Sequence, residues 1–349
     1  MRNYLLAGVF LIAALPCGAM AQDEAAPATA DFKVTVTKVG GDGGWDYLTA
    51  DGAARRLYIP RSGPTARITV YDLDTLKPAG TIPGVNAHGV AIDPKSGHGF
   101  TTSKPLVMFD TKTLAPIKTI TVDGSPDGSL FDPFNQRVYI FSHSAPNVTV
   151  IDATNGAVLG TIDLGGMPEQ GVSDGNGRIY VDLVDKDQVA VVDAKTMSVI
   201  TRYDLDGVGA GPAGLALDTK NNVLFVACHN ETMVFLNAAD GKFVYALPIG
   251  AGVDGAAFDP KASEVYATAG DGTLSALKVT SPTNFQFDGT GTVFTPDGAR
   301  TITLDPTTGK IYSVTAEFGP APAPAANATG RPQRGPMVAG SFQILTVSK

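Results

Sequence analysis

The chain has 349 residues, with 26 Lys and Arg against 34 Asp and Glu, and so carries a formal net charge of −8 at neutral pH. Affinity for nucleic acids comes chiefly from Lys and Arg that neutralise phosphates, so this balance argues against a nucleic-acid partner. A chain of this length can bury a core large enough to stabilise it without cross-links.

The first segment has the features of a secretory signal peptide. An apolar run occupies residues 4–15, and Ala-Met-Ala at 19–21 is an A-x-A cleavage site. We expect residues 1–21 to be removed by cleavage after Ala21, residues 22–30 to form a flexible segment, and the protein to be periplasmic or secreted. No later stretch is apolar for long enough to span a bilayer, so no transmembrane segment is expected.

The cysteine count gives no internal disulfide. Of the two cysteines, Cys17 lies within the predicted signal peptide, which leaves Cys228 alone. Cys228 and His229 are consecutive in a predicted strand and therefore point to opposite faces. We expect Cys228 to pack between blades as a small hydrophobic residue and His229 to be the site candidate.

From residue 46 onward, a short strand-like motif recurs about every forty residues and ends in Asp-Pro or in another turn-forming pair such as Asp-Gly or Asp-Thr. Its copies are DYLTADG at 46, HGVAIDP at 88, DGSLFDP at 127, EQGVSDG at 169, AGLALDT at 213, DGAAFDP at 254 and RTITLDP at 300. Each is followed by alternating strands such as RVYIFSH and NVTVID, a turn such as ATNG, and a last strand such as AVLGTI. This pattern predicts an all-β fold, a seven-bladed β-propeller of four-stranded antiparallel blades.

The two ends of the chain complete one blade. The last unit stops at SFQILTVSK, before any fourth strand, and the segment DFKVTVTKV at 31–39 is a strand without a blade of its own. An N-terminal strand that completes the last blade would remove the open sheet edges. We therefore expect one propeller domain over residues 31–349.

The repeated pattern, strand-DP-strand-VxVID-turn-GKVxxTI, resembles the YVTN-repeat, YncE-like family of bacterial seven-bladed propellers. The words HGVAIDP, ACHN, GDGTL and TAEFGP resemble an exported subgroup of that family. The resemblance implies the fold but no single function, because such propellers serve as binding proteins, enzyme subunits and catalysts. Single-stranded DNA binding, which is associated with some YncE-like proteins, is disfavoured by the negative net charge.

One mouth of the central channel gathers most of the unusual polar residues. In a propeller blade the innermost strand begins on the face where the second strand ends. The innermost strands begin at Asp46, His88, Asp127, Glu169, Ala213, Asp254 and Arg300, and the second strands end at Arg61, Lys104, His143, Asp185, His229, Gly270 and Glu317. The remaining histidine, His98, falls on the opposite face.

We expect this mouth to bind a small polar molecule or a protein partner, with the protein a monomer. The candidate ligand-binding residues are Asp46, Arg61, Lys104, Asp254 and Glu317. For each acid and cation, a turn or ion-pair role is the alternative structural interpretation.

The alternative function is a metal-dependent periplasmic hydrolase or lyase, lactonase-like, at the same mouth. Imidazoles with nearby carboxylates suit Zn, Cu or Fe. The metal candidates are His88, His143 and His229, and the catalytic candidates are Glu169 or Asp127 as general base and Arg300 as holder of a carboxylate or oxyanion.

Other motifs carry no chemistry. The Gly-x-Ser-x-Gly match at 171–175 precedes another strand rather than a helix, and GGDGG at 40–44 precedes no helix either. No C-x-x-C-H sequence for covalent haem is present, so no haem is expected, and without a glycine-rich phosphate cradle no nucleotide cofactor is expected. The Pro- and Ala-rich insertion at 318–340 is either a flap over the channel or a passive insertion.

Overall fold

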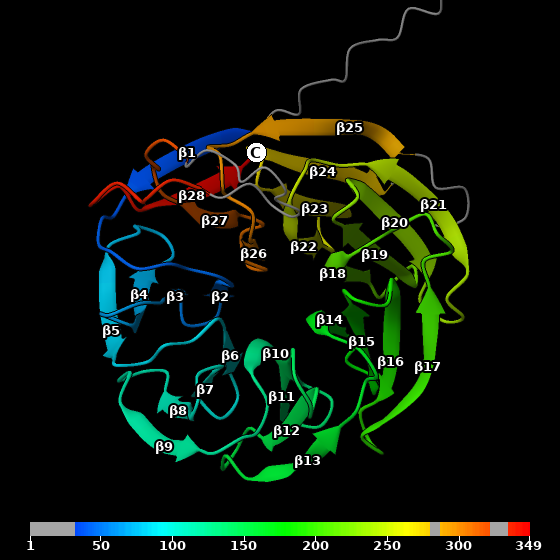
Figure 1. The fold of residues 1–349 in the computed structure, drawn as a ribbon, viewed down its shortest axis with the longest axis horizontal. Coiled ribbons are helices and arrows are strands. Elements are labelled where there is room, and N and C mark those ends of the chain that lie inside the picture. The colour runs from blue at the N-terminus through cyan, green and yellow to red at the C-terminus, as the bar shows by residue number, and fades with distance from the viewer. Residues whose placement is uncertain (1–31, 280–286, 322–333) are drawn as a thin grey trace, which may run out of the picture.

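The structure, a computed structural model, describes residues 32–279, 287–321 and 334–349. The predicted signal peptide 1–21 and segment 22–30 lie outside the described residues. Every regular element among those described is a β-strand, and the strands form seven four-stranded antiparallel sheets arranged in a ring (Figure 1). The predicted seven-bladed propeller is confirmed.

Each blade runs from an innermost strand to an outer edge strand. Blades 1 to 3 consist of β2 Thr49–Asp51, β3 Arg56–Arg61, β4 Arg67–Asp72, β5 Pro78–Pro83; β6 Val90–Asp93, β7 His98–Thr101, β8 Leu106–Asp110, β9 Pro116–Ile120; β10 Pro126–Asp132, β11 Arg137–Ser142, β12 Val148–Asp152 and β13 Val158–Ile162. Blades 4 to 6 consist of β14 Pro168–Ser173, β15 Arg178–Leu183, β16 Gln188–Asp193, β17 Ser198–Asp204; β18 Pro212–Asp218, β19 Val223–Cys228, β20 Thr232–Asn237, β21 Phe243–Pro248; β22 Val253–Asp259, β23 Glu264–Ala269, β24 Thr273–Val279 and β25 Phe287–Phe294.

Blade 7 joins the two ends of the chain. It consists of β26 Thr303–Leu304, β27 Ile311–Thr315, β28 Gln343–Ser348 and the N-terminal β1 Lys33–Lys38. The outer strand β1 pairs antiparallel with β28 from Lys33 opposite Ser348 to Lys38 opposite Gln343. The prediction that an N-terminal strand closes the ring is confirmed, and this pairing covers an edge that would otherwise be open.

The core lies between neighbouring blades. Both faces of a middle strand pack against another blade, which explains why β19 is apolar and buried along its whole length. Cys228 belongs to the cluster between blades 4 and 5 and has no exposed surface. Burial raises the pKa of its thiol to about 12. The prediction that Cys228 packs as a hydrophobic residue is confirmed.

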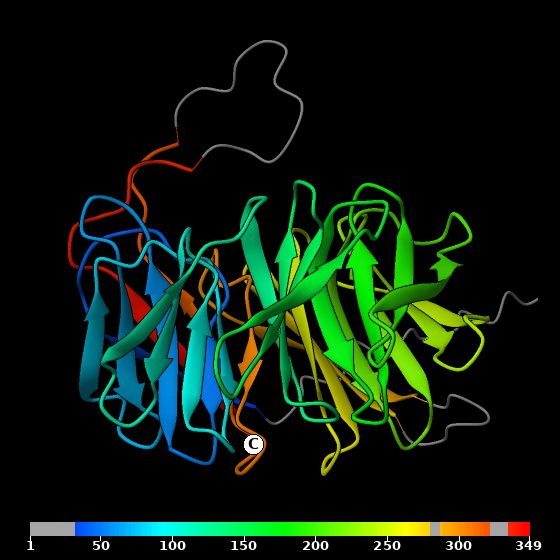
Figure 2. The ribbon, with the colours of Figure 1, turned by 90° about the horizontal axis from the view of Figure 1, so that it is seen from below.

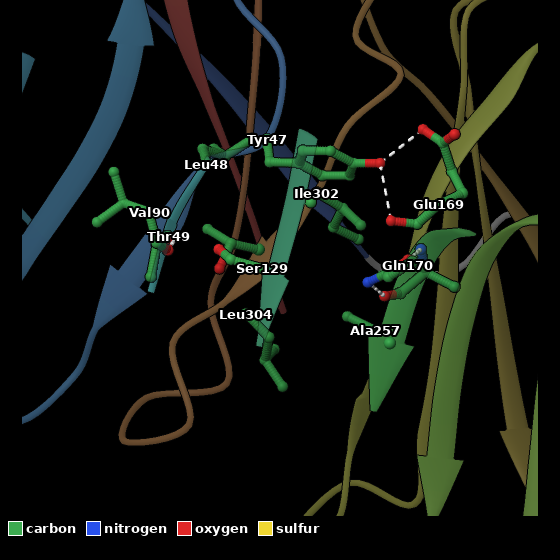
Figure 3. Close-up of a pocket in the computed structure, with 14 residues that line it drawn as sticks. Tyr47, Leu48, Thr49, Val90, Ser129, Glu169, Gln170, Ala257, Ile302 and Leu304 are labelled. Atoms are coloured by element: carbon green, nitrogen blue, oxygen red, sulfur yellow. Dashed lines mark hydrogen bonds between the residues drawn. The ribbon is translucent and has the colours of Figure 1, made fainter. Parts of the chain in front are cut away.

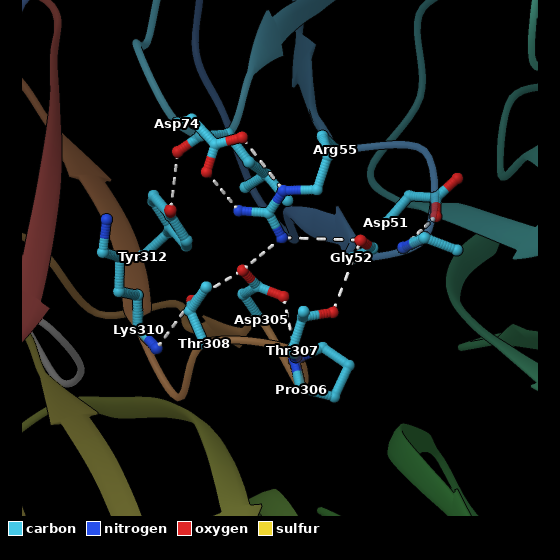
Figure 4. A network of polar contacts seen from close by, with 12 residues as sticks. Asp51, Gly52, Arg55, Asp74, Asp305, Pro306, Thr307, Thr308, Lys310 and Tyr312 are labelled. Atoms are coloured by element: carbon cyan, nitrogen blue, oxygen red, sulfur yellow. Dashed lines mark hydrogen bonds and ion pairs between the residues drawn. The ribbon is translucent and has the colours of Figure 1, made fainter.

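A polar network ties blade 7 to blade 1 on the face opposite the mouth (Figure 4). Arg55, in the turn before β3, donates from Nη1 to the buried Asp305 at 2.6 Å and from Nη2 to the exposed Asp74 at 2.6 Å. Gly52 lies so close to Asp305 that a Cβ there would sit 2.7 Å from a carboxylate oxygen. The seam at which the ring closes is therefore held by β1 at its outer edge and by this network beneath.

Candidate functional site

Five of the predicted residues form one continuous row at the mouth. Asp46 and His88 precede β2 and β6, Asp127 and Glu169 are the second residues of β10 and β14, and His143 follows β11. All five positions lie where an innermost strand begins or a second strand ends, which is why residues from four blades meet. Carboxylates and imidazoles alternate along the row.

The distances along the row are those of hydrogen bonds and ion pairs. His88 Nδ1 lies 2.8 Å from Asp46 Oδ2 and 3.1 Å from Asp127 Oδ1. His143 Nε2 lies 3.3 Å from Asp127 Oδ2 and 3.1 Å from Glu169 Oε2. The side chains of Asp127 and Glu169 are 10% and 15% exposed, whereas those of His88 and His143 are 52% and 35% exposed. The carboxylates thus form a floor and the imidazoles face solvent.

Tyr47 reaches from blade 1 to Glu169 of blade 4 (Figure 3). Its hydroxyl donates to Glu169 Oε1 at 2.6 Å and lies 3.3 Å from the Glu169 carbonyl oxygen, which joins blade 1 to blade 4. Burial and the nearby carboxylates raise the pKa of Tyr47 well above its usual value, so it remains a donor. A cavity of about 200 Å³ lies along the channel and is lined by polar groups that include Thr49, Ser129 and Gln170.

Gln170 fixes the opposite wall of this cavity (Figure 3). Its Oε1 accepts from the backbone N–H of Leu215 at 2.9 Å and of Ala256 at 3.2 Å, and its Nε2 donates to the Ala256 carbonyl at 3.2 Å. The Gln170 N–H in turn donates to Asp182 at 2.6 Å, and burial raises the pKa of that carboxyl well above its usual value. Blades 4, 5 and 6 are therefore fixed relative to one another beneath the mouth.

The row has an unusual protonation pattern. The hydrogen bond to Glu169 raises the pKa of His143 to about 9 despite partial burial. Burial, together with the charges of Glu169 and Asp46, raises the pKa of Asp127 to about 7. Burial acts to raise the Glu169 pKa, but hydrogen bonds from His143 and Tyr47 outweigh it and lower that pKa. The directions of these shifts favour a protonated His143 beside an ionised Glu169, with Asp127 harder to ionise than an ordinary aspartate.

Arg300 occupies the other side of the mouth and forms an ion pair with Asp254 through Nε. Burial acts to lower the pKa of Arg300, but the charge of Asp254, its hydrogen bond and the charge of Asp46 together outweigh burial, and the net shift is upward. Arg300 also lines a cavity of about 670 Å³ with Arg334, Phe318 and small residues of blade 6. The guanidinium carbon of Arg334 lies 5.2 Å from the centre of the Phe318 ring.

Three other predicted ligand-binding residues make contacts away from the row. Arg61 is fully buried, lies 3.4 Å from the centre of the Phe342 ring and donates to the Gly43 carbonyl at 3.0 Å. Burial lowers its pKa to about 10. Lys104 donates to the Gly124 carbonyl at 2.6 Å, and Glu317 pairs with Lys38 of β1 at 2.7 Å.

The described residues contain two groups of three ligand atoms that lie within 4.8 Å of one another, as a metal site requires. One group is Asp46, His88 and Asp127, and the other is Asp127, His143 and Glu169. His229 is exposed and belongs to neither group, although its charge acts on Glu169. The structure thus brings together two of the three predicted metal ligands, with carboxylates between and beside them.

Sequence reasoning missed Tyr47 and Gln170. Each directly follows a residue that was predicted for the mouth, Asp46 or Glu169. Consecutive residues of an extended backbone point in opposite directions, and Gln170 in β14 and Tyr47 just before β2 both line the channel cavity. A polar residue next to a mouth position was the available signal.

The family profile for outer membrane protein assembly factor BamB matches residues 144–311. Two curated relatives, both named uncharacterized protein YncE and from Salmonella typhi and Salmonella typhimurium (strain LT2), are each 29% identical over 194 residues. The alignment covers 53% of this chain and 54% of each relative, so the chain spans about half the length of the curated relatives it matches. The chain is a seven-bladed β-propeller that is similar in sequence to YncE.

Solved structures agree with this propeller fold at low sequence identity. A chain from the crystal structure of the mitotic checkpoint complex has a TM-score of 0.66 and 12% identity, and the match covers 90% of the present chain and 96% of that chain. A chain of Kuenenia stuttgartiensis hydrazine synthase has a TM-score of 0.64 and 17% identity, covering 79% and 94%. Among the described residues, we find no helix with the length and apolar character needed to cross a membrane.

Proposed function

We propose that this β-propeller is exported and binds a small ligand with a carboxylate group at the channel mouth. The supporting observation is the cavity of about 670 Å³, which Arg300 and Arg334 line beside the row of imidazoles and carboxylates. Its volume lies within the range of pockets that hold small molecules.

The lining combines two guanidinium groups with apolar surface and with the carboxylates of Asp271 and Asp297. The Asp271 carboxylate accepts from Ala251 N and Thr273 Oγ1, so its own turn supplies donors for it. A guanidinium group has five N–H donors in a planar fork, so Arg300 can bind a ligand carboxylate while its Nε remains bonded to Asp254. Phe318 and Ala251 provide apolar surface in the same cavity. Phe318, Gly319 and Ala321, which belong to the 318–340 insertion, form part of its wall. Figure 2 shows the described parts of this insertion, in orange and red, on one face of the ring.

The experiment is a titration with benzoate, compared with benzyl alcohol as its uncharged analogue, on protein without residues 1–21. We expect benzoate alone to raise the melting temperature saturably. Arg300→Gln and Arg334→Gln should each weaken binding at least about tenfold, since each removes a charged donor. Arg178→Gln, in blade 4 on the opposite face, is the matched control. Equal responses to benzoate and benzyl alcohol, or unchanged binding in both mouth variants, would contradict the proposal.

Export is tested separately by the N-terminus of protein recovered from its native host. A mature chain that begins at Gln22 is expected, and a chain that retains residues 1–21 would contradict the proposed export.

A metal-dependent hydrolase or lyase is the second candidate, because the two groups of metal-ligand type lie at the same mouth. A bound divalent ion would lower the pKa of a coordinated water and polarise a carbonyl of the ligand. Glu169 and Asp127 would remain the candidates for proton transfer and Arg300 the holder of negative charge. Turnover of simple lactones or esters that requires added metal and is lost in Arg300→Gln would support this candidate.

A further inference from the structure

We propose that the row binds two divalent transition-metal ions and that Asp127 bridges them. This inference rests on the proposed binding role of the mouth and specifies what the row itself binds. It differs from a single ion held by three histidines, because each ion would have one imidazole and two carboxylates.

The first observation is the orientation of the Asp127 carboxylate. Its Oδ1 lies 3.1 Å from His88 Nδ1, whereas its Oδ2 lies 3.3 Å from His143 Nε2. Each oxygen therefore lies nearest the imidazole of a different group of three ligand residues. A carboxylate can bind a separate ion through each oxygen, as occurs in sites where two ions lie about 3.5–4 Å apart.

The second observation is the spacing within each group. Bonds of about 2.0–2.2 Å from an ion to nitrogen and oxygen place neighbouring ligands of a tetrahedral site about 3.4 Å apart. The imidazole nitrogens lie 2.8 and 3.1 Å from the oxygens of the first group and 3.3 and 3.1 Å from those of the second. Outward movements of a few tenths of an ångström would therefore accommodate an ion in each group.

The third observation is that Glu169 and the chain at His88 are held by hydrogen bonds with residues outside the row. Tyr47 donates to Glu169 Oε1, so Oε2 is directed to His143. Thr102 Oγ1 accepts from the backbone N–H groups of His88 and Gly89 at 3.2 and 2.7 Å, which fixes the chain at His88. Such supporting contacts orient metal ligands and fix which of their atoms face the ion.

Mixed imidazole and carboxylate donors favour Zn²⁺, Mn²⁺ or Fe²⁺ over Ca²⁺, which prefers oxygen alone. Three protein ligands leave at least one coordination position of each ion for water or a ligand oxygen. The imidazoles are partly exposed, so ions can enter from solvent.

The experiment is a titration of metal-free protein with Zn²⁺, and separately with Co²⁺ followed by its visible absorption, with bound metal measured after gel filtration. We expect two equivalents in the wild type, one in His88→Ala and one in His143→Ala. Asp127→Asn should bind at most one, since an amide offers a single ligand oxygen. His229→Ala and His98→Ala, which change histidines outside both groups, should still bind two.

A wild-type break at one equivalent overturns the bridged pair. Loss of that single ion in His88→Ala, His143→Ala and His229→Ala would instead indicate one ion held by three histidines. Absence of binding by the wild type overturns any metal at the row. The wild-type stoichiometry decides even where a variant fails to fold. Benzoate binding that depends on Arg300 is measured independently, so it can survive when the metal pair does not.

Discussion

Removal of the Asp305 carboxylate should open the seam at which the ring closes. Asp305 is fully buried in blade 7 and accepts from Thr307 N at 2.9 Å, Thr308 Oγ1 at 2.7 Å and Arg55 Nη1 at 2.6 Å (Figure 4). The first two are local to the turn, whereas Arg55 belongs to blade 1. One side chain therefore holds both its own turn and the neighbouring blade.

The magnitude follows from these three bonds. All three bonds are accepted by a carboxylate, and a hydrogen bond to a charged group contributes about 1.5–3 kcal/mol. The cost of burying the carboxylate offsets part of this sum. Water reaches the partly exposed Arg55 and offsets part of its loss, so we expect Asp305→Ala to lower the free energy of unfolding by about 3 kcal/mol. Asp74→Ala removes an exposed carboxylate from the same guanidinium and should cost less than about 1 kcal/mol.

The assay is urea unfolding followed by far-UV circular dichroism, with the midpoints of both variants compared with the wild type. Burial acts to raise the Asp305 pKa, but hydrogen bonds from Thr308 and Arg55 outweigh it and lower that pKa. The stabilisation is therefore complete above the unfolded-state pKa of about 3.9 and is lost as the pH falls through the lower folded-state value. The gap between the wild type and Asp305→Asn should thus narrow below about pH 4. Equal midpoints for Asp305→Ala and Asp74→Ala would refute this reasoning.

Two further predictions concern buried groups. Gln170→Leu should lower the free energy of unfolding by about 2 kcal/mol, because the N–H groups of Leu215 and Ala256 lose their acceptor. Gln188→Leu, which removes a hydrogen bond near the surface, should change that free energy little. Equal melting temperatures for the two variants would contradict this prediction. In protein without residues 1–21, the Cys228 thiol should be unreactive towards a disulfide reagent at pH 8 and react fully in urea, and rapid reaction of the native protein would show that it is accessible.

The fold could be predicted from the sequence because it repeats. A strand-like word with an Asp-Pro turn every forty residues or so indicates one blade per copy. The missing strand of the last copy then predicted the pairing of β1 with β28, which the register from Lys33 to Lys38 confirms. The alternation of apolar and polar residues and the spacing of the repeats were sufficient to predict the blades and their closure, so no long-range contact had to be known in advance.

The site could be predicted only as a set of positions. Strand direction predicted that His88, Asp127 and His143 lie at one mouth. It did not predict that one oxygen of Asp127 contacts His88 and the other contacts His143. Arg61 lies at the end of the second strand of its blade, as His143 does in blade 3. Its guanidinium nevertheless packs on Phe342, which lies far away in the sequence. Side-chain direction at a strand end depends on tertiary neighbours, and a repeat pattern carries no record of them.

The two halves of the mouth are electrostatically connected through Asp46. Its carboxylate forms the end of the row at His88, and its charge also contributes to the upward shift of the Arg300 pKa, to which Asp254 contributes more and which burial opposes. Its backbone carbonyl accepts from Thr301, the residue that follows Arg300. A change of charge at the His88 end of the row should therefore change the electrostatic potential at Arg300, because the two sites interact in a partly buried environment. Occupancy of the row and binding of an anion beside it are consequently expected to influence each other.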